Sequence, residues 1–480
     1  MLAAHLKVIS LPSICGFLFR IAFWLLPSFV QKRLLHEPSK PEKLYPTSYL
    51  DGIRGLAALF VFFCHFSYTS FVITRGYGHG AEGENQNLLQ LPIIRLFYSG
   101  PPMVCLFFVV SGYALSLKSL KQMRARNFSG LLNTMASSIF RRAARLFLPT
   151  AISTFMVVIM LRLGWYERTR EFSGDRTFMR NIVEHHPARL PTFADQYYDW
   201  GWKLFDFVHI WSWEPFGGSI SYDLHLWTIP VEFRASMVLF LVLIGVSRTR
   251  AWVRQVLYFT LFYYFLRWDR WDMMLFISGT MIAEFDLIRA ESRSRSPSTS
   301  TDVAPNSTQS DMPPSYENQA TLIFGHILAF VALYLLSQPD DSAEETPGWV
   351  TLASLIPEYF TIKYRFWQSI GGILFVFALS ICPPLQRPFN HPAIQYLGKI
   401  SYALYLMHGP VLHVVGYVVQ EWAWHVTGWE TQGQYIGGFL LSSVFIIPVV
   451  IWAGDVFWRG VDVYCVMFAR WLESVCFIKG

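Results

Sequence analysis

Long apolar runs recur along this chain, and they constrain its fold more than any other feature. Runs of about 17 to 25 predominantly apolar residues are long enough to cross the hydrocarbon core of a bilayer as α-helices. The composition agrees, because 53% of the 480 residues are hydrophobic and only 15% are charged, against about 25% charged in ordinary soluble domains. The sequence therefore predicts an integral, multi-pass membrane protein and argues against a soluble enzyme.

We predict an all-α fold, a polytopic transmembrane helical bundle of about ten spans, because helices satisfy their own backbone hydrogen bonds in lipid. The predicted spans are residues 54–74, 101–119, 139–163, 223–246, 252–267, 271–288, 321–337, 365–382, 393–419 and 434–457. Charged residues separate the fifth span from the sixth, and one re-entrant hairpin is the alternative for that pair. The apolar stretch 8–30 contains Arg20 and predicts an N-terminal interfacial or re-entrant helix, with a true span as its alternative.

Basic residues collect in alternate short loops, as they do on the cytosolic side of membrane proteins. They precede the first predicted span, separate the second from the third, and follow the fourth and the sixth. Both termini would then face the cytosol, and the aromatic-rich loop 164–222 would lie on the opposite face. Because the formal net charge of +6 is modest and gathers in these loops, we expect no nucleic-acid partner.

Composition divides the chain into five segments. These are an N-terminal cytosolic or interfacial segment 1–45, a first membrane part 46–290, a linker 291–320, a second membrane part 321–460 and a C-terminal cytosolic tail 461–480. The linker is rich in Ser, Thr and Pro and is predicted to be disordered. Within it, Pro313, Pro314 and Tyr316 fit a ligand of a WW domain, although a chance match in such a linker is the favoured interpretation. The six cysteines are scattered, and we expect no metal site.

Arg54 and His65 stand eleven residues apart on one apolar segment. At about 100° per residue, eleven steps return to within about 20° of the same helix face, with a rise of about 16 Å. Arg54 would lie at the cytosolic mouth and His65 near the middle of the bilayer, where ionisable groups usually face a pathway or a partner. A snorkelling arginine and a satisfied core histidine are the alternative, but the shared face favours a functional pair.

Glu232 in the fourth predicted span and His408 in the ninth are expected at a similar depth to His65. A carboxylate at a helix centre costs about 2.5–3.5 kcal/mol on insertion scales, so Glu232 needs a partner or water. Arg234 could be a purely structural partner. A histidine beside a carboxylate has the groups needed for general base catalysis.

Arg141, Arg142 and Arg145 form a basic cluster where an anionic substrate could enter. Arginine binds phosphate through charge-assisted, often bidentate hydrogen bonds. The tendency of basic residues to remain in the cytosol explains such a cluster equally well.

Four segments, in this order, resemble the integral membrane acyltransferase-3 family, and the resemblance extends from about Tyr49 to Trp458. The most specific is Asp-Gly-x-Arg-Gly-x-Ala with ten residues between Arg54 and His65. The others are Phe-Phe-x-x-Ser-Gly at 107–112, Trp-Thr-x-x-x-Glu at 227–232 and Ser-Tyr-x-Leu-Tyr-Leu-x-His at 401–408. Two departures are Met407, where family members often have Trp, and Pro230 within the glutamate segment.

The resemblance implies an enzyme that transfers an acyl group, commonly acetyl, from acyl-coenzyme A to a hydroxyl. Arg54 and His65 would belong to the catalytic centre, with Glu232 and His408 as further candidates, and the arginine cluster would contact coenzyme A. His65 would deprotonate the acceptor hydroxyl, although a covalent acyl-His65 intermediate is an alternative. Arg54 or a nearby hydroxyl could stabilise the oxyanion, or Arg54 could bind phosphate. No permanently bound cofactor is expected, because acyl-coenzyme A is a substrate.

A transporter is the main alternative from another class, because buried His, Glu and Arg also build proton relays. The chain has no convincing internal repeat, which many transporters show. The expected partners are membrane lipid, acyl-coenzyme A and a small-molecule acceptor with a hydroxyl group, either lipophilic or a glycan. The identity of the acceptor and the length of the acyl chain are not determined by the sequence. The Ser- and Pro-rich linker favours the endoplasmic reticulum or another endomembrane over the plasma membrane.

Overall fold

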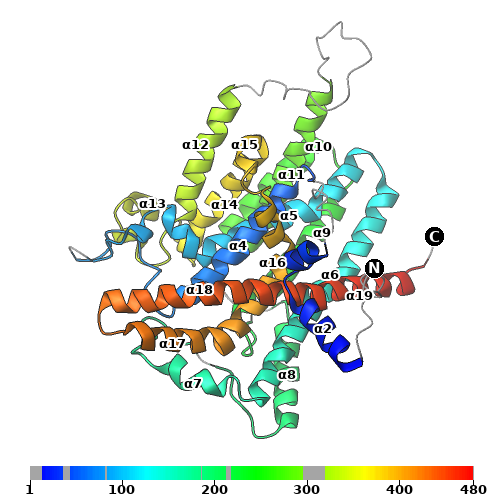
Figure 1. Ribbon diagram of the computed structural model, residues 1–480. Coiled ribbons are helices and arrows are strands. Elements are labelled where there is room, and N and C mark those ends of the chain that lie inside the picture. The colour runs from blue at the N-terminus through cyan, green and yellow to red at the C-terminus, as the bar shows by residue number, and fades with distance from the viewer. Residues whose placement is uncertain are drawn as a thin grey trace, which may run out of the picture.

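Helices make up the regular secondary structure of the described residues in this computed structural model (Figure 1). The structure describes residues 13–35, 44–81, 84–184, 186–211, 218–295 and 319–478. Within these ranges, eight helical segments are long and apolar enough to cross a membrane. They are Ser48–Ser67, Gly100–Arg124, Phe128–Arg162, Leu224–Gly245, Gln319–Leu336, Tyr364–Ile381, Pro392–Thr427 and Gln432–Cys476. The predicted all-α, polytopic class is confirmed.

The helices named below are given with their bounds in chain order. They are α2 (Ser13–Leu25), α3 (Ser28–Leu34), α4 (Ser48–Ser67), α5 (Gly100–Arg124), α6 (Phe128–Arg162), α7 (Glu167–Gly174), α8 (Phe193–Phe207), η4 (Leu224–Trp227), α9 (Thr228–Gly245), α10 (Ala251–Arg267), α11 (Trp271–Arg295), α12 (Gln319–Leu336), α14 (Tyr364–Ile381), α16 (Pro392–Val411), α17 (Tyr417–Thr427), α18 (Gln432–Phe457) and α19 (Val463–Cys476). Short π-helical turns join α16 to α17 and α18 to α19.

Two of the ten predicted spans, 252–267 and 271–288, are not among the eight spanning segments. They form α10, which has 17 residues, and α11, whose acidic residues lower its hydropathy. Both segments are helical. Arg254 of α10 pairs with Glu284 of α11 at 2.5 Å, and both side chains are buried. The charges that lower the hydropathy of this pair are therefore compensated inside the bundle.

Glycine contacts bring α4 and α16 together at backbone distance. A Cβ on Gly55 would lie 2.3 Å from the nitrogen of Gly398, and a Cβ on Gly398 would lie 2.4 Å from the carbonyl oxygen of Asp51. Small residues allow this close approach of two helices. The contact fixes the relative height of α4 and α16, and hence of the histidines His65 and His408 that they carry.

The helix α4 ends at Ser67, earlier than the predicted end at residue 74. The side-chain amide of Asn181 donates hydrogen bonds to the carbonyl oxygens of Tyr68 (2.7 Å) and Phe71 (3.1 Å), just past the helix end. Such bonds satisfy carbonyl groups that have no partner within a helix. His65 therefore lies in the last turn of α4.

The N-terminal helices dock against the C-terminal ones. The described part of the predicted N-terminal segment includes helix α2, with 13 residues from Ser13 to Leu25, and residues 8–12 lie outside the described residues. Ser28 Oγ donates to Asp455 Oδ1 at 2.6 Å, and Arg459 donates to the carbonyl oxygen of Trp24 at 2.8 Å. Helices α18 and α19 run as one long rod in Figure 1. The predicted C-terminal tail therefore continues the last helix.

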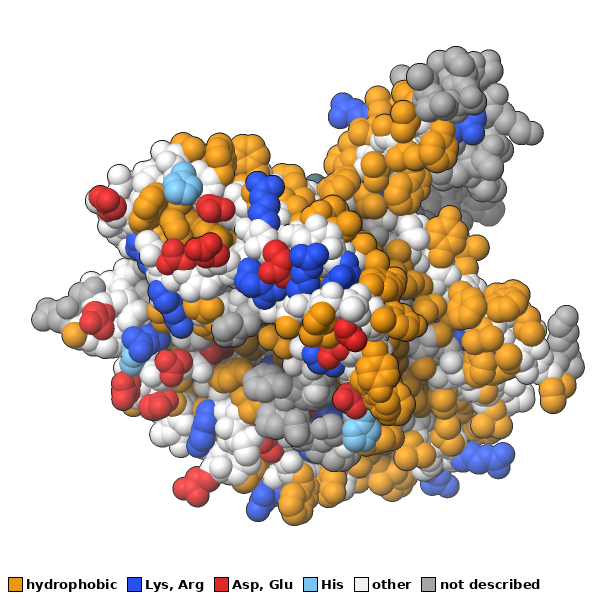
Figure 2. Space-filling model, turned by 90° about the horizontal axis from the view of Figure 1, so that it is seen from below, with side chains coloured by type: hydrophobic (Ala, Val, Ile, Leu, Met, Phe, Trp, Pro, Cys, Tyr) orange, Lys and Arg blue, Asp and Glu red, His pale blue; other side chains and the backbone are white. Residues whose placement is uncertain are grey.

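Apolar side chains cover part of the outer surface. On α10 and α12, Phe259, Tyr263 and Phe330 are each more than 60% exposed, as expected of side chains that face lipid. Figure 2 shows hydrophobic side chains dominating the right flank of one face, while most charged side chains gather over its left half. The segment 296–318, with Pro313, Pro314 and Tyr316 of the predicted linker, lies outside the described residues.

Candidate active site

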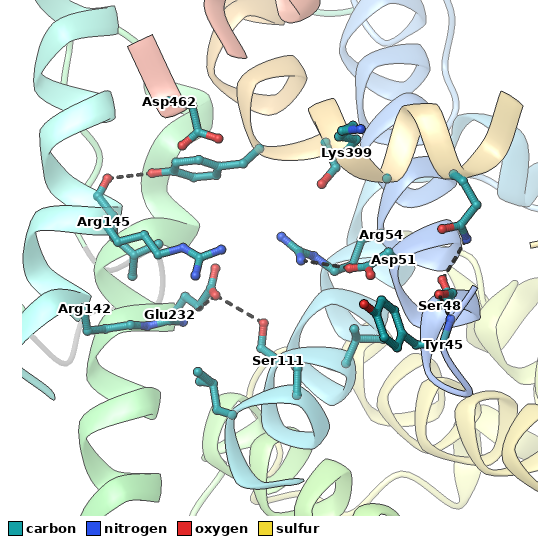
Figure 3. A pocket seen from close by; sticks show the side chains of 18 of the residues that line it. Tyr45, Ser48, Asp51, Arg54, Ser111, Arg142, Arg145, Glu232, Lys399 and Asp462 are labelled. Atoms are coloured by element: carbon teal, nitrogen blue, oxygen red, sulfur yellow. Dashed lines mark hydrogen bonds and ion pairs between the residues drawn. The ribbon is translucent and has the colours of Figure 1, made fainter. Parts of the chain in front are cut away.

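A basic cavity of about 550 Å³ opens at the end of α4 that is predicted to be cytosolic. Side chains from α4, α5, α6, α9, α16 and the π-helical turn before α19 line it, and their polar members include Asp51, Arg54, Ser111, Arg142, Arg145, Glu232, Lys399, Tyr402 and Asp462. Figure 3 shows the guanidinium groups of Arg54 and Arg145 pointing toward one another across this cavity. Like charges that face each other repel, unless water or an anion lies between them. The geometry therefore suits an anionic ligand.

Among the three clustered arginines, Arg142 and Arg145 line the cavity. Arg142 is buried and pairs with Glu232 at 2.7 Å. Arg145 is exposed, and the structure places no carboxylate within 4.0 Å of it among the described residues. Arg141 lies on another face of α6 and pairs with Glu473 of α19 at 2.9 Å, so the prediction that it contacts the ligand is not supported by its position. Only part of the cluster therefore faces the cavity.

Glu232 belongs to the cavity and not to the histidines. It accepts hydrogen bonds from Ser111 Oγ (3.2 Å) and Arg142 Nη2 (2.7 Å). The structural partner considered for it, Arg234, instead pairs with Asp272 at 3.1 Å. Glu232 was expected at a similar depth to His65 and His408; the structure pairs it with Arg142 on the neighbouring α6, at the cavity wall.

A narrow neck of about 50 Å³ continues from the cavity along α4. Arg54, Ser111, Glu232, Ser401 and Tyr402 line both spaces. The neck's own lining is mostly apolar and consists of Val61, Val104, Phe107, Phe108, Thr228, Ile229 and Tyr405. Because Val61 precedes His65 by one helical turn, the neck leads from the basic cavity toward His65.

Three histidine rings meet one helical turn beyond Val61 and Tyr405 of the neck lining, although none of the three lines the neck itself. The ring centroids of His65 and His225 are 4.0 Å apart, those of His65 and His408 are 5.2 Å apart, and those of His225 and His408 are 5.1 Å apart. The rings come from the last turn of α4, from η4 before α9, and from the end of α16. His65 and His408, which were expected at a similar depth, lie side by side here, and His225 lies beside both.

Hydrogen bonds fix two of the rings. His408 Nδ1 lies 2.6 Å from the carbonyl oxygen of Tyr405, which can only accept, so Nδ1 carries the proton and Nε2 carries the lone pair. The carboxylate of Asp223 accepts from the backbone nitrogen of His225 at 3.1 Å and begins η4. The hydroxyl of Tyr405 donates to the carbonyl oxygen of His225 and so ties η4 to α16.

Carboxylates lie against both nitrogens of His225. Asp223 Oδ1 is 2.9 Å from Nδ1, and Glu184 Oε1 is 2.8 Å from Nε2. Glu184 also accepts a hydrogen bond from the Tyr417 hydroxyl at 2.7 Å and lies 3.6 Å from His413 Nε2. Burial alone would raise the pKa of Glu184, but the charges of His225 and His413 outweigh burial and hold that pKa well below its usual range. Glu184 is therefore a buried anion.

The three rings also offer one nitrogen each within 4.8 Å of one another, which is the kind of grouping that holds a metal ion. A metal ligand must present a lone pair, so its histidine ring is neutral. His225 has a carboxylate against each nitrogen, as a doubly protonated ring requires. The cluster thus fits proton chemistry better than it fits a metal ion.

Sequence reasoning missed Glu184, Asp223, His225 and His413. Two of them carried a usable signal, because Asp223 and His225 directly precede the Trp-Thr-x-x-x-Glu segment that was singled out. Glu184 lies in the long loop 164–222, and no helical periodicity connects it to the other residues.

Comparison with known proteins agrees with the resemblance in the sequence. A family model described as an acyltransferase domain matches residues 47–454. The O-acetyltransferase PaAT-1 of Phomopsis amygdali is 33% identical over 472 residues, which cover 93% of this chain and 87% of that protein. The acyltransferase R4 of a Phoma species is 27% identical over 466 residues, covering 89% of this chain and 96% of the relative. No solved structure matches significantly.

The family model extends over nearly the whole membrane domain, including all three histidines and most of the residues that line the cavity. The four segments that carry the resemblance lie within the matched residues. This chain therefore belongs to the integral membrane acyltransferase-3 family and is an acyl-transferring enzyme.

Proposed function

We propose that the enzyme moves an acetyl group from acetyl-coenzyme A to a hydroxyl of a small lipophilic or glycan acceptor, with His65 as the general base. The observation that carries the proposal is the path from a basic cavity, through an apolar neck, to within one turn of the half-buried His65. Membership in an acyltransferase family removes the reason to prefer a transporter.

The cavity supports a phosphorylated donor. Arg54 and Arg145 face one another across it, and Lys399 lies on its wall. Arginine pairs bidentately with phosphate oxygens, and such charge-assisted bonds are stronger than neutral ones. The diphosphate of acetyl-coenzyme A would lie between the two guanidinium groups, on the face predicted to be cytosolic.

The distance from the cavity to His65 suits the pantetheine arm. Arg54 and His65 are separated by eleven helical residues, or about 16 Å. The arm has about thirteen bonds between diphosphate and sulfur, and since three bonds of an extended chain span about 3.3–3.6 Å, it reaches about 15 Å. A diphosphate held at Arg54 would therefore place the thioester beside His65, with the arm in the apolar neck.

At that position His65 has the chemistry of a general base. Its Nδ1 is buried and has no hydrogen-bond partner among the described residues. The proton of the acceptor hydroxyl would pass to His65 while the acceptor oxygen bonds to the thioester carbon. The carbon–sulfur bond then breaks, and the leaving thiolate takes the proton from His65, so that no proton is gained or lost overall.

The acceptor is proposed only as a class. One relative is named an O-acetyltransferase and others acyltransferases, which favours an oxygen nucleophile. Sterols, terpenoid or polyketide alcohols and sugars all present a hydroxyl. We place the enzyme in the endoplasmic reticulum or another endomembrane, with membrane lipid around it.

The test uses purified protein in lipid nanodiscs with acetyl-coenzyme A labelled in the acetyl group and a panel of such alcohols. We expect labelled ester with at least one alcohol, and a fall in turnover of about 10²–10⁴-fold in His65→Ala, the usual contribution of a general base. His326→Ala on α12, at a histidine outside the cluster, should keep parental turnover. Undiminished turnover in His65→Ala, with matched folding, would contradict the assignment.

A further inference from the structure

Arg54 is too far from His65 to stabilise the charge that develops in acyl transfer. The two residues are about 16 Å apart along α4. An oxyanion donor must lie within about 2.7–3.1 Å of the thioester oxygen. The structure therefore leaves the reacting end of the path without the donor considered from the sequence, and another group must supply it.

We propose that His225, held doubly protonated by Asp223 and Glu184, is the oxyanion donor of this enzyme. The inference rests on the proposed function and adds to it a catalytic residue that neither the sequence nor the family comparison assigned. Asp223 and Glu184 act through His225 and are positioning residues.

The charge on His225 follows from the geometry. A neutral imidazole has one protonated nitrogen and one lone pair. Asp223 accepts from Nδ1 at 2.9 Å, so in a neutral ring the lone pair would be on Nε2, 2.8 Å from a carboxylate oxygen of Glu184. Two negative charges this close to a buried ring favour its doubly protonated form, even though the Nε2 proton does not point along the line to Glu184. The pKa of Glu184, held well below its usual range, agrees with a carboxylate that stays ionised there.

The position of His225 is suitable for a donor. Its ring centroid lies 4.0 Å from that of His65, so a thioester that reaches His65 also reaches His225. Tyr405, which lines the neck, donates to the His225 carbonyl, and Thr228, also in the neck, bonds to the Tyr405 hydroxyl at 2.7 Å. The end of the neck is thus built on the residues that hold His225.

A proton on His225 Nε2 remains available to a substrate. Glu184 Oε1 is close to Nε2, but their geometry does not meet the angles of a hydrogen bond, and Nε2 is a buried nitrogen without such a bond among the described residues. His408 cannot serve instead, because its proton on Nδ1 is given to the Tyr405 carbonyl and its Nε2 carries a lone pair. Of the three rings, His225 has the donor.

The step balances without a further reactant. As the acceptor oxygen bonds to the thioester carbon, the carbonyl electron pair moves onto oxygen, and the Nε2 proton of His225 hydrogen-bonds to that oxyanion. When the carbonyl re-forms, the carbon–sulfur bond breaks and the thiolate takes the proton that His65 removed from the hydroxyl. His225 keeps both protons throughout.

The test compares the parent, His225→Gln, Glu184→Gln and Asp223→Asn in nanodiscs with acetyl-coenzyme A. We expect kcat to fall about 10²–10³-fold in His225→Gln, as on removal of one oxyanion donor, with the KM for acetyl-coenzyme A within threefold of the parent. The carboxylate variants should lose less. His425→Gln, at an exposed ring on α17, is the matched control.

A second measurement separates this role from a structural one. With acetyl-coenzyme A carrying ¹³C at the thioester carbonyl, infrared difference spectra should show the carbonyl stretch of the bound donor at lower frequency than in water. The shift should be lost in His225→Gln and reduced in Glu184→Gln and Asp223→Asn. A variant that only misfolds would lose binding of the donor, and not the shift alone.

The outcomes distinguish the two proposals. If the parent transfers no acetyl from acetyl-coenzyme A, the proposed function fails and this inference fails with it. If the parent is active but His225→Gln keeps kcat within threefold, or if the bound carbonyl is unshifted in the parent, only the inference is overturned. One bound divalent metal ion per protein, lost together with activity on chelation, would also overturn it, because a coordinating ring cannot be doubly protonated.

Discussion

The basic cavity and the histidine cluster lie toward opposite ends of α4, and their charged side chains differ in exposure and in pairing. In the cavity, Arg145 is exposed and the side chain of Arg54 is 32% exposed, with Asp51 at 3.5 Å as its only close carboxylate among the described residues. In the cluster, the side chains of Glu184 and His225 are 6% and 5% exposed and directly paired. Solvated cations are available to bind a ligand, whereas buried pairs fix the charge of a site in advance.

Arg145→Ala tests whether the basic cavity binds the donor, and it is expected to have the largest effect. A hydrogen bond to a charged group contributes about 1.5–3 kcal/mol, so we expect the KM for acetyl-coenzyme A to rise roughly tenfold to a hundredfold, with kcat little changed. Competition by coenzyme A and by its 3′-dephospho form, measured in parent and variant, shows which phosphate the guanidinium contacts. Arg248→Ala, another basic residue on the predicted cytosolic side, is the control. An unchanged KM would remove Arg145 from the binding site.

Gly398→Val tests the backbone contact between α4 and α16, which fixes the relative positions of the cavity and the cluster. A Cβ there would lie 2.4 Å from the carbonyl oxygen of Asp51, so α16 must move away from α4. Overpacking usually costs about 1–3 kcal/mol, and we expect a lower melting temperature together with reduced turnover, because His408 shifts relative to His65. Gly433→Val, at a glycine whose Cβ would meet nothing within 4 Å, should change neither. Full stability in Gly398→Val would show that the helices are not held by this contact.

The two regions also differ in how far the sequence predicts them. Helical periodicity places Arg54 and His65 on one face of one helix, which needs no tertiary information. It does not predict the partner of Glu232, because only packing decides that Arg142 reaches it from α6. Glu184 reaches His225 from a long loop, and the sequence of a loop has no helical periodicity from which such a contact could be predicted. Charges within one helix are predictable, and charges paired between elements are not.

Near the histidine cluster, the stability of the fold should depend on pH through His186, whose ring lies 4.6 Å from that of His413. Burial, with the charges of His413 and Arg170, lowers the pKa of His186 to about 3. In the unfolded chain the ring titrates near its ordinary value, about 6.5, so the unfolded state binds more protons between about pH 6.5 and 3. Stability is then complete above this window and falls within it, by up to about 1.4 kcal/mol per pH unit.

Thermal unfolding in detergent between pH 7.5 and 5 measures this loss. His186→Gln should flatten the dependence of the melting temperature on pH, while His209→Gln, at an exposed histidine of the same loop, should keep the parental slope. An identical slope in parent and His186→Gln would mean that the buried ring of His186 does not make the fold sensitive to acid.

The smallest effect is expected for Glu473→Gln, which tests why Arg141 is excluded from the cavity. The ion pair between Arg141 and Glu473 joins α6 to α19, and its side chains are 34% and 20% exposed. Partly solvated pairs of this kind contribute under about 1 kcal/mol, so the melting temperature should fall only slightly. The KM for acetyl-coenzyme A should stay at the parental value, because Arg141 lies outside the cavity lining. A KM that falls severalfold would mean that Arg141, once released from Glu473, swings into the cavity and adds a third cation to the donor site.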